Sequence, residues 1–200
     1  MDMIIATHNK HKVEEFSRIL APLGITIRTA ELTEAEENGI TFMENAYIKA
    51  KSACDETGLP CIADDSGLSI DYLNGEPGVY SARYAEEGKR KLTVLEKLKD
   101  VPDEQRGAHF TSAIACVFPN GDALEAEGHC YGRITRELRG NGGFGYDPIF
   151  LCTEDGCMNK TFGEATPEEK DAVSHRGKSL RVFAEKLENY LQKKEGYNIC

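Results

Sequence analysis

Two adjacent carboxylates, Asp64 and Asp65, follow a short apolar run at residues 61–63, which the sequence predicts to be a buried strand. Side chains of successive strand residues point to opposite faces, so both acids reach one site only if the chain turns beside them. The Ser66-Gly67 pair permits such a turn. Carboxylate oxygens suit Mg²⁺, which typically takes one or two carboxylates together with phosphate oxygens of a substrate. The pattern favours a magnesium site, and an Asp-Asp-Ser-Gly turn without a ligand is the alternative.

Basic residues crowd the start of two predicted helices, in the motifs THNKHK (residues 7–12) and SHRGK (residues 174–178). Positive charges oppose the helix dipole at that end, where acids are favoured by about 0.3–1 kcal/mol each. One such motif is as easily a solvated basic patch. Two of them in an acidic chain favour an anionic ligand with several phosphates, because the start of a helix also offers N–H groups to anions.

A further group of polar residues surrounds a helix predicted over residues 41–56. Acids at positions 34, 36 and 37 precede it, and Thr41 with Glu44 forms a capping box at its start. On the helix, Asn45, Lys49 and Ser52 share one polar stripe at i, i+4 and i+7. Lys49 is therefore a candidate to face the paired acids, although an ordinary exposed face would look the same.

The motif GNGGFGYDPIF, residues 140–150, combines four glycines with an aromatic pair and an acid. Glycine allows the backbone to approach a ligand closely. Phe144 or Tyr146 could stack on a base, and Asp147 could accept a hydrogen bond from its edge. The alternative is a glycine-rich hairpin loop with a buried aromatic anchor.

The elements that must position these residues alternate between strands and helices. Apolar periodicity predicts strands at residues 3–7, 25–27, 61–63, 109–118, 123–131 and 149–152, and helices at 12–20, 41–56, 89–98 and 175–194. The turn residues 119–122 predict a hairpin between two of the strands. The sequence thus predicts an α/β fold with a mixed β-sheet flanked by helices, as one domain over residues 1–195 with a loose tail at 196–200.

Composition narrows the function. The chain has 200 residues and a net charge of −10, which argues against nonspecific binding to nucleic acid or to an anionic membrane. No segment approaches the roughly 20 apolar residues of a membrane helix. The seven cysteines form no C-x-x-C pair, so reduced thiols in a cytoplasmic protein are expected rather than a disulfide or zinc framework.

Six motifs in order make the chain resemble the inosine triphosphate pyrophosphatase family, the house-cleaning XTP/dITP diphosphatases. They are THNKHK, ENGITFMENAYIKAK, IADDSGL, GEPGVYSARY, GGFGYDPIF and EEKDAVSHRGKSL, and they reach from residue 7 to about residue 180. One departure is visible: the family commonly has Thr-Gly-Asn in the first motif, whereas His8 replaces the glycine here.

The resemblance implies Mg²⁺-dependent hydrolysis of deaminated purine nucleoside triphosphates (ITP, dITP, XTP) to the monophosphate and pyrophosphate. It also implies an elongated mixed sheet, two lobes with a central substrate cleft, and a homodimer. By motif, the triphosphate is held by Thr7, His8, Asn9, Lys10, His11 and Lys12. Glu36 and Asp65 bind the metal, with Glu37 left open as the alternative to Glu36, and Asp65 is the general base for water. The remaining substrate contacts are assigned to Ser66, Phe144, Gly145, Tyr146, Asp147, Lys170, His175 and Arg176, with support from Lys49 and Asp64.

Two other functions remain as alternatives. A non-catalytic nucleotide sensor would bind triphosphates and signal to a partner, but it needs no carboxylate that activates water. A Maf-like nucleotide pyrophosphatase would perform similar chemistry on other bases. Pyrophosphate release from a panel of nucleoside triphosphates distinguishes the three.

Overall fold

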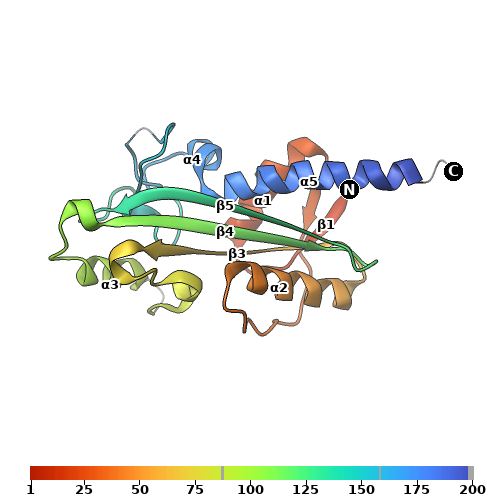
Figure 1. Cartoon of the computed structure of the whole chain (residues 1–200), viewed down its shortest axis with the longest axis horizontal. Helices are drawn as coiled ribbons and strands as arrows, with labels where there is room; N and C mark the ends of the chain where they lie inside the picture. Colours follow the sequence, from red (N-terminus) through yellow and green to blue (C-terminus); the bar gives the residue numbers. More distant parts are fainter. Residues whose placement is uncertain (87, 158, 198–200) are drawn as a thin grey trace. The chain divides into compact units, whose positions relative to one another are not determined.

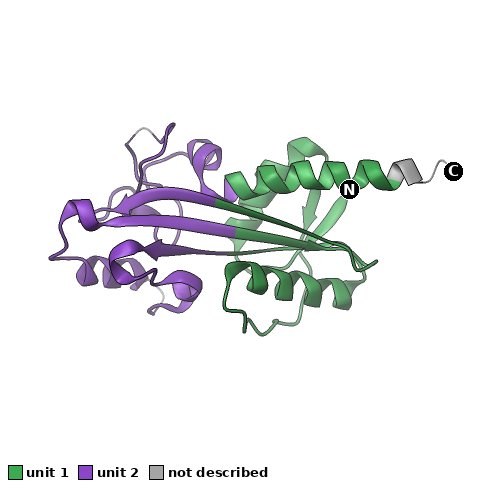
Figure 2. Ribbon diagram, in the orientation of Figure 1, with its two compact units in different colours: residues 1–65, 113–128, 178–200 green, residues 66–112, 129–177 purple. Residues whose placement is uncertain are grey.

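The computed structural model describes residues 1–86, 88–157 and 159–197. The chain divides into two compact units, each built from separate stretches of sequence (Figure 2). Unit 1 comprises residues 1–65, 113–128 and 178–200, and unit 2 comprises residues 66–112 and 129–177. Asp65 is thus the last residue of its stretch in unit 1, and Ser66 is the first residue of unit 2.

Within the described residues, the sheet has six strands in the order β2-β1-β3-β4-β5-β6 (Figure 1). Its strands are β1 (Asp2–Ile5), β2 (Thr26–Arg28), β3 (Cys61–Ile70), β4 (Gly107–Val117), β5 (Ala123–Ile134) and β6 (Phe150–Cys152). β1 runs parallel to β2 and β3, whereas β5 and β6 are antiparallel, so the sheet is mixed. The helices are α1 (Lys10–Leu20), α2 (Phe42–Thr57), α3 (Arg90–Lys97), α4 (Pro167–Val173) and α5 (His175–Tyr197). The predicted α/β class and the mixed sheet are confirmed.

The turn predicted at Ser66-Gly67 is wrong, because β3 continues as one strand from Cys61 to Ile70. The backbone N–H groups beyond the acids find partners outside the strand: Leu68 donates to Ser81 Oγ at 2.9 Å and Ile70 donates to the Glu76 carbonyl at 3.1 Å. Because these backbone donors are paired, the chain can stay extended beyond residue 63.

The core of unit 1 has two layers on either side of its strands. Ile62 packs with α1 and α5 through Phe16, Leu20, Leu180 and Phe183, whereas Cys61 and Ala63 pack against α2 through Ala46, Ala50 and Ala53. Figure 1 shows α1 and α5 on one face and α2 on the other. This alternation follows from the two-residue period of a strand, and it fixes the face on which each later side chain of β3 emerges.

The core of unit 2 is rich in aromatic rings. Phe110 packs against Phe150 at 4.6 Å between ring centroids and stacks on Phe162 at 6.0 Å. Beside this cluster, Arg106 is buried, and its guanidinium donates to the backbone carbonyls of Leu98, Ile134 and Thr135. One side chain therefore joins the end of α3 to the end of β5 within unit 2.

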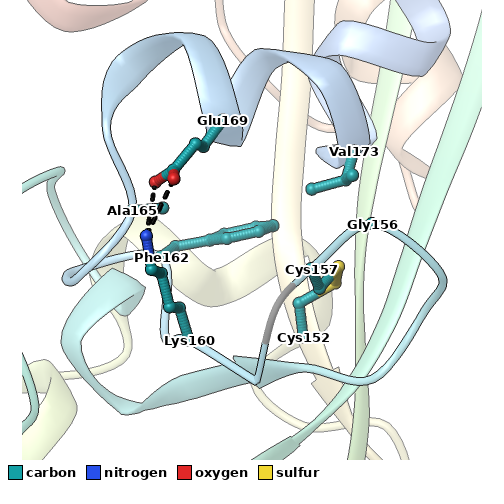
Figure 3. A pocket seen from close by; sticks show the side chains of 8 residues that line it. All are labelled: Cys152, Gly156, Cys157, Lys160, Phe162, Ala165, Glu169 and Val173. Atoms are coloured by element: carbon teal, nitrogen blue, oxygen red, sulfur yellow. Dashed lines mark hydrogen bonds and ion pairs between the residues drawn. A yellow bond between two sulfur atoms is a disulfide. The ribbon is translucent and has the colours of Figure 1, made fainter.

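The expectation that all cysteines are free thiols is wrong for one pair. Cys152 and Cys157 form a disulfide, with their Cα atoms 5.6 Å apart, a separation at which the two sulfurs can meet. The C-x4-C spacing did not predict the disulfide, because the two sulfurs meet only when the loop between Cys152 and Cys157 folds back on itself. Figure 3 shows the disulfide near the ion pair of Lys160 with Glu169, whose nitrogen and oxygen are 2.8 Å apart.

Two boundaries also differ from prediction. The last helix runs to Tyr197 rather than to residue 194, so it occupies the first part of the predicted tail, and residues 198–200 lie outside the described residues. α4 was not predicted as a helix at all. In the part of the chain that the structure describes, no helix has the length and apolar character needed to cross a membrane.

Candidate active site

The paired acids emerge on opposite faces of β3 and meet different helices of unit 1. Asp64 lies on the side of α1, where Lys12 Nζ is 2.7 Å from its Oδ2 atom. Asp65 lies on the side of α2, where it accepts from Asn45 Nδ2 at 3.2 Å and from Lys49 Nζ at 3.1 Å. The straight strand thus gives each acid its own cationic partner instead of bringing both to one side.

Lys12 and Lys49 come from opposite faces of β3 but contact the same backbone atom of that strand. Lys12 Nζ and Lys49 Nζ both donate to the Asp64 carbonyl oxygen, at 3.2 and 3.1 Å. Their ammonium groups therefore converge on one point of the strand, although their side chains come from α1 and α2. Two cations beside two buried carboxylates form a compact charged cluster in unit 1.

Lys49 also reaches the acidic loop before α2. Its Nζ atom lies 3.3 Å from Glu37 Oε1 and 3.1 Å from Asp65 Oδ1, so one cation bridges the two carboxylates. Glu36, the residue assigned to the metal by motif, is exposed to solvent. Of the two glutamates left open by the sequence, Glu37 is therefore the one that this conformation turns toward Asp65.

The start of α2 positions this loop and Asn45. Thr41 and Glu44 form the predicted capping box, in which each side chain accepts from the other residue's backbone N–H. Asn45, fully buried, accepts from the Gly39 N–H at 2.9 Å through Oδ1 while Nδ2 donates to Asp65. A Cβ atom at position 39 would lie 2.7 Å from Asn45 Oδ1, so only glycine allows this approach.

Asn45 was missed as a site residue. The signal was present, because Asn45 lies on the same polar stripe of the helix as Lys49. What the stripe could not show is that this face is buried against β3 rather than exposed.

The Asp65 carboxyl has a raised pKa. Burial is the largest cause, and the like charge of Asp64 adds to it, while the nearby ammonium groups of Lys49 and Lys12 act in the opposite direction. A carboxylate with a raised pKa accepts a proton more readily than an ordinary aspartate at neutral pH. The raised pKa therefore suits Asp65 to act as a general base.

The donor set fits a magnesium ion that relies largely on its substrate. Among the described residues, no group of three or more histidine, cysteine or acidic side chains is placed to hold a metal. Asp65 and Glu37 supply carboxylate oxygens around a position that a cation, the Lys49 ammonium, already bridges. Two carboxylates completed by phosphate oxygens and water are a usual arrangement for Mg²⁺.

In the first motif, residues 7–12, Asn9 caps α1 and Lys12 contacts Asp64. Asn9 caps α1 through its side chain, which accepts from the N–H groups of His11 and Lys12, and Thr7 Oγ1 accepts from the Asn9 N–H at 3.2 Å. Of the four basic residues in this motif, Lys12 pairs with the buried Asp64. His8, Lys10 and His11 are exposed. A role for the whole motif in holding phosphates stays a prediction.

A second cluster lies in unit 2 around Asp147. Its carboxylate accepts from Lys170 Nζ at 2.8 Å and from the Phe144 N–H at 2.8 Å. Lys170 Nζ also lies 4.6 Å from the centroid of the Phe144 ring. Gly143 has a positive φ of 66°, and a Cβ there would collide with the Asp147 carboxylate, so glycine is required beside this pair.

Arg176 connects this cluster to the first residue of unit 2. The Nη2 atom donates to Ser66 Oγ at 2.8 Å, and the guanidinium carbon lies 5.8 Å from the Phe144 ring centroid. Arg176 is 1% exposed, so its charge is held inside the unit rather than spread over a surface. The structure thus brings together Ser66, Phe144, Asp147, Lys170 and Arg176.

Two residues assigned to the substrate are used inside the protein. The His175 ring stacks on Phe110 with centroids 4.6 Å apart, and His175 is 4% exposed. Tyr146 belongs to the buried core of unit 2, and its hydroxyl donates to the Ser81 carbonyl at 2.9 Å. Gly145 lies between Phe144 and Tyr146 with a positive φ of 59°. Direct contact of these residues with a substrate stays a prediction.

Comparison with known proteins agrees with the motifs. The model of the Ham1 family matches residues 3–186. The dITP/XTP pyrophosphatase of Photorhabdus laumondii is 47% identical over 196 residues, which cover 94% of this chain and 98% of that protein. The corresponding protein of Desulforamulus reducens is 45% identical over 195 residues, covering 94% of this chain and 96% of the relative.

Solved structures give the same result for the fold. The HAM1 protein from Coxiella burnetii superposes with a TM-score of 0.83 at 40% identity, covering 94% of this chain and 99% of that one. The Ham1 protein of Staphylococcus aureus gives a TM-score of 0.82 at 34% identity, covering 95% of this chain and 100% of that one. The resemblance expected from the six motifs is confirmed. The chain belongs to the Ham1 family.

Proposed function

We propose that this protein is a nucleoside triphosphate pyrophosphatase that hydrolyses deaminated purine nucleoside triphosphates, ITP, dITP and XTP, to the monophosphate and pyrophosphate. The observation that carries the proposal is Asp65, a buried carboxylate with a raised pKa that is held by Lys49 and Asn45. The relatives named above are dITP/XTP pyrophosphatases, and their similarity extends over nearly the whole chain.

Unit 1 has the chemistry that a polyphosphate requires. Pyrophosphate release depends mainly on neutralising charge and on aligning a water molecule. Lys12 and Lys49 supply positive charge beside the acids. Mg²⁺, held by Asp65 and Glu37, would neutralise further charge on the phosphate oxygens. Asp65 accepts a proton from the attacking water as the water oxygen forms a bond to the α-phosphorus. The bond from that phosphorus to the oxygen bridging the α- and β-phosphates breaks, and pyrophosphate leaves with that oxygen.

Unit 2 has the chemistry that a nucleoside requires. Phe144 offers a ring face to a base, and Arg176 offers a forked pair of donors that can bind an oxo group. Hypoxanthine and xanthine carry a 6-oxo group and lack the 2-amino group of guanine. Asp147 and Lys170 are buried and pair with each other, so a base whose edge does not complement them would have its own polar groups desolvated without hydrogen bonds, which penalises its binding.

Three further features belong to the same proposal. The chain acts as one functional domain over residues 1–195, it assembles as a homodimer, and it works in the cytoplasm on free nucleotides. The resemblance to the pyrophosphatase family supports these statements. Light scattering on the purified protein, with a mass of twice 22.1 kDa expected, tests the dimer.

The decisive experiment is a substrate panel. The protein is incubated with inosine, xanthosine, guanosine, adenosine and pyrimidine triphosphates, with Mg²⁺ or with EDTA, and the monophosphate and pyrophosphate are measured. The proposal predicts Mg²⁺-dependent release of both products, fastest from the inosine and xanthosine nucleotides. Tight binding without turnover would instead support a sensor, and preferential turnover of other bases would support the Maf-like alternative.

A further inference from the structure

The motif GEPGVYSARY, residues 75–84, has no part in the chemistry described so far. Its residues lie along the edge of β3 in unit 2, where Ser69 pairs with Pro77 in an isolated antiparallel bridge. The Ile70 N–H donates to the Glu76 carbonyl at 3.1 Å, and the Gly75 N–H donates to the Ile70 carbonyl at 3.0 Å. The motif therefore takes the place of a neighbouring strand along this part of β3.

Ser81 makes the deepest contacts of the motif. The Ser81 hydroxyl accepts from the Leu68 N–H at 2.9 Å and donates to the Gly78 carbonyl at 2.7 Å. Its own carbonyl accepts from the Tyr146 hydroxyl at 2.9 Å. Ser81 is 6% exposed, so water cannot readily replace these partners. Ser81 thus lies between β3 and the loop that carries Tyr146.

Tyr146 joins Ser81 to the cluster around Asp147 in unit 2. It lies between Phe144 and Asp147, and the Asp147 N–H donates to the Phe144 carbonyl at 3.1 Å in a tight turn. Burial raises the pKa of Tyr146 to about 12, so its hydroxyl keeps its proton at neutral pH and can donate. Because the turn is tight, the hydrogen bond of the Tyr146 hydroxyl restrains the backbone that carries Phe144 and Asp147.

Leu68, the other hydrogen-bond partner of Ser81, lies close in sequence to Ser66, which also belongs to the cluster around Asp147. Leu68 is two residues beyond Ser66 on β3, and Ser66 accepts from Arg176. The path Leu68–Ser81–Tyr146 therefore links the strand that holds Ser66 to the loop that holds Phe144 and Asp147. Every residue on this path belongs to unit 2.

We propose that Ser81 is a positioning residue for nucleoside recognition: through its hydrogen bonds to Leu68 and Tyr146 it sets the Phe144–Asp147 loop relative to Ser66 and Arg176. Tyr146 then acts through its hydroxyl from the core rather than by touching the substrate. This inference rests on the proposed function, because it assigns a task within the same site.

Tyr146→Phe is the main test, since it removes one oxygen atom and leaves the ring in the core. Binding of inosine monophosphate and of inorganic tripolyphosphate is measured by calorimetry, together with kcat and KM for dITP. Loss of one buried hydrogen bond predicts about three- to tenfold weaker binding of inosine monophosphate. Tripolyphosphate binding should be unchanged, and KM for dITP should rise while kcat changes by less than about twofold.

Tyr84→Phe is the matched control, because the Tyr84 hydroxyl also makes a hydrogen bond, to Glu76 Oε2 at 2.7 Å, but at an exposed place in the same motif. It should leave all of these quantities as in the wild type. Ser81→Ala should reproduce the selective loss with a lower Tm, because the Leu68 N–H loses its acceptor, and Ser81→Thr should restore both. If Ser81→Ala does not fold, Tyr146→Phe still decides the question.

Two results would overturn the positioning role. One is unchanged binding of inosine monophosphate by Tyr146→Phe; the other is an equal loss for inosine monophosphate and tripolyphosphate, as general destabilisation would give. These results are distinct from failure of the proposed function, which would appear as a wild-type protein that does not hydrolyse dITP.

Discussion

Lys49 Nζ lies 3.1 Å from Asp65 Oδ1, and this contact joins the middle of α2 to the residue of β3 proposed as the general base. The same ammonium group contacts Glu37 at 3.3 Å. Lys49 thus lowers the cost of holding a buried carboxylate ionised, while burial itself raises the pKa of Asp65. The two effects therefore oppose each other at the Asp65 carboxyl.

Replacing Asp65 with asparagine should abolish most of the turnover without unfolding the protein. The change keeps the size of the side chain but removes the basicity, and a general base typically contributes about 10²–10⁴-fold to kcat. We expect kcat for dITP to fall by at least about 10²-fold. Because ionisation of Asp65 is unfavourable in the folded state, the variant should have a Tm equal to that of the wild type or higher.

The control for this variant is Asp55→Asn. Asp55 is also an aspartate that pairs with a lysine, Lys51, but both side chains are exposed on α2. Its turnover should be that of the wild type. Near-normal kcat in Asp65→Asn would contradict its role as base, and a collapsed Tm would mean that the acids serve only the fold.

The pH profile should respond to Lys49. A base must be ionised to accept a proton, so activity should be lost as pH falls through the raised pKa of Asp65. The Lys49 ammonium lowers that pKa, and Lys49→Met should therefore move the acid limb of kcat/KM to higher pH. Lys51→Met, on the exposed part of α2, should leave the limb in place.

The same pKa has a consequence for stability, with a definite sign. A carboxyl group whose folded pKa is raised binds more protons in the folded state than in the unfolded state, so its ionisation costs stability. The free energy of unfolding of the wild type, relative to Asp65→Asn, should therefore decline as pH rises from the ordinary value of 3.8 through the raised pKa. An increase over this range in urea titrations would contradict the burial effect.

Lys12→Ala should raise KM and also destabilise the protein. The Asp64 side chain is 1% exposed, and its partner Lys12 Nζ lies 2.7 Å away. Removing one member of a buried pair leaves an uncompensated charge and typically costs about 3–5 kcal/mol. The partial exposure of Lys12 should place the effect at or below the low end of this range.

A double variant separates the two effects of Lys12. Lys12→Ala combined with Asp64→Asn removes both charges, so it should recover much of the lost Tm. If Lys12 contacts phosphate, the raised KM for dITP should persist in the double variant. Recovery of KM together with Tm would show that Lys12 acts only through Asp64.

The sequence predicted features that depend on local signals. The start of α2 was correct because a threonine and a glutamate three residues apart can satisfy each other's backbone without help from the rest of the fold. The same signal occurs at Thr166 and Glu169, with Pro167 between them, and it could have revealed α4. Short helices of this kind have little apolar periodicity, which explains why α4 was overlooked.

Features that depend on distant partners could not be predicted. β3 continues past residue 63 because Leu68 finds a hydrogen-bond acceptor 13 residues away, in Ser81. The buried Arg176 donates to Ser66 Oγ, 110 residues earlier in the chain. The sequence pattern of a single strand or helix cannot show a hydrogen-bond partner that lies this far away in the chain. For the same reason the acids of β3 were expected on one side of the strand and lie on two.

Arg176 should govern the choice of base. Its guanidinium donates to Ser66 and lies over the Phe144 ring, so both its forked geometry and its charge are held in place. Arg176→Ala should reduce the ratio of kcat/KM for dITP to that for dATP, by roughly tenfold if one bidentate contact of about 1–3 kcal/mol is lost. Arg176→Lys keeps the charge but loses the fork, and it should therefore also lose selectivity. Arg181→Ala, an exposed change on the same helix, is the control. An equal fall in activity on dITP and dATP would assign Arg176 to phosphate binding or to the fold instead of base recognition.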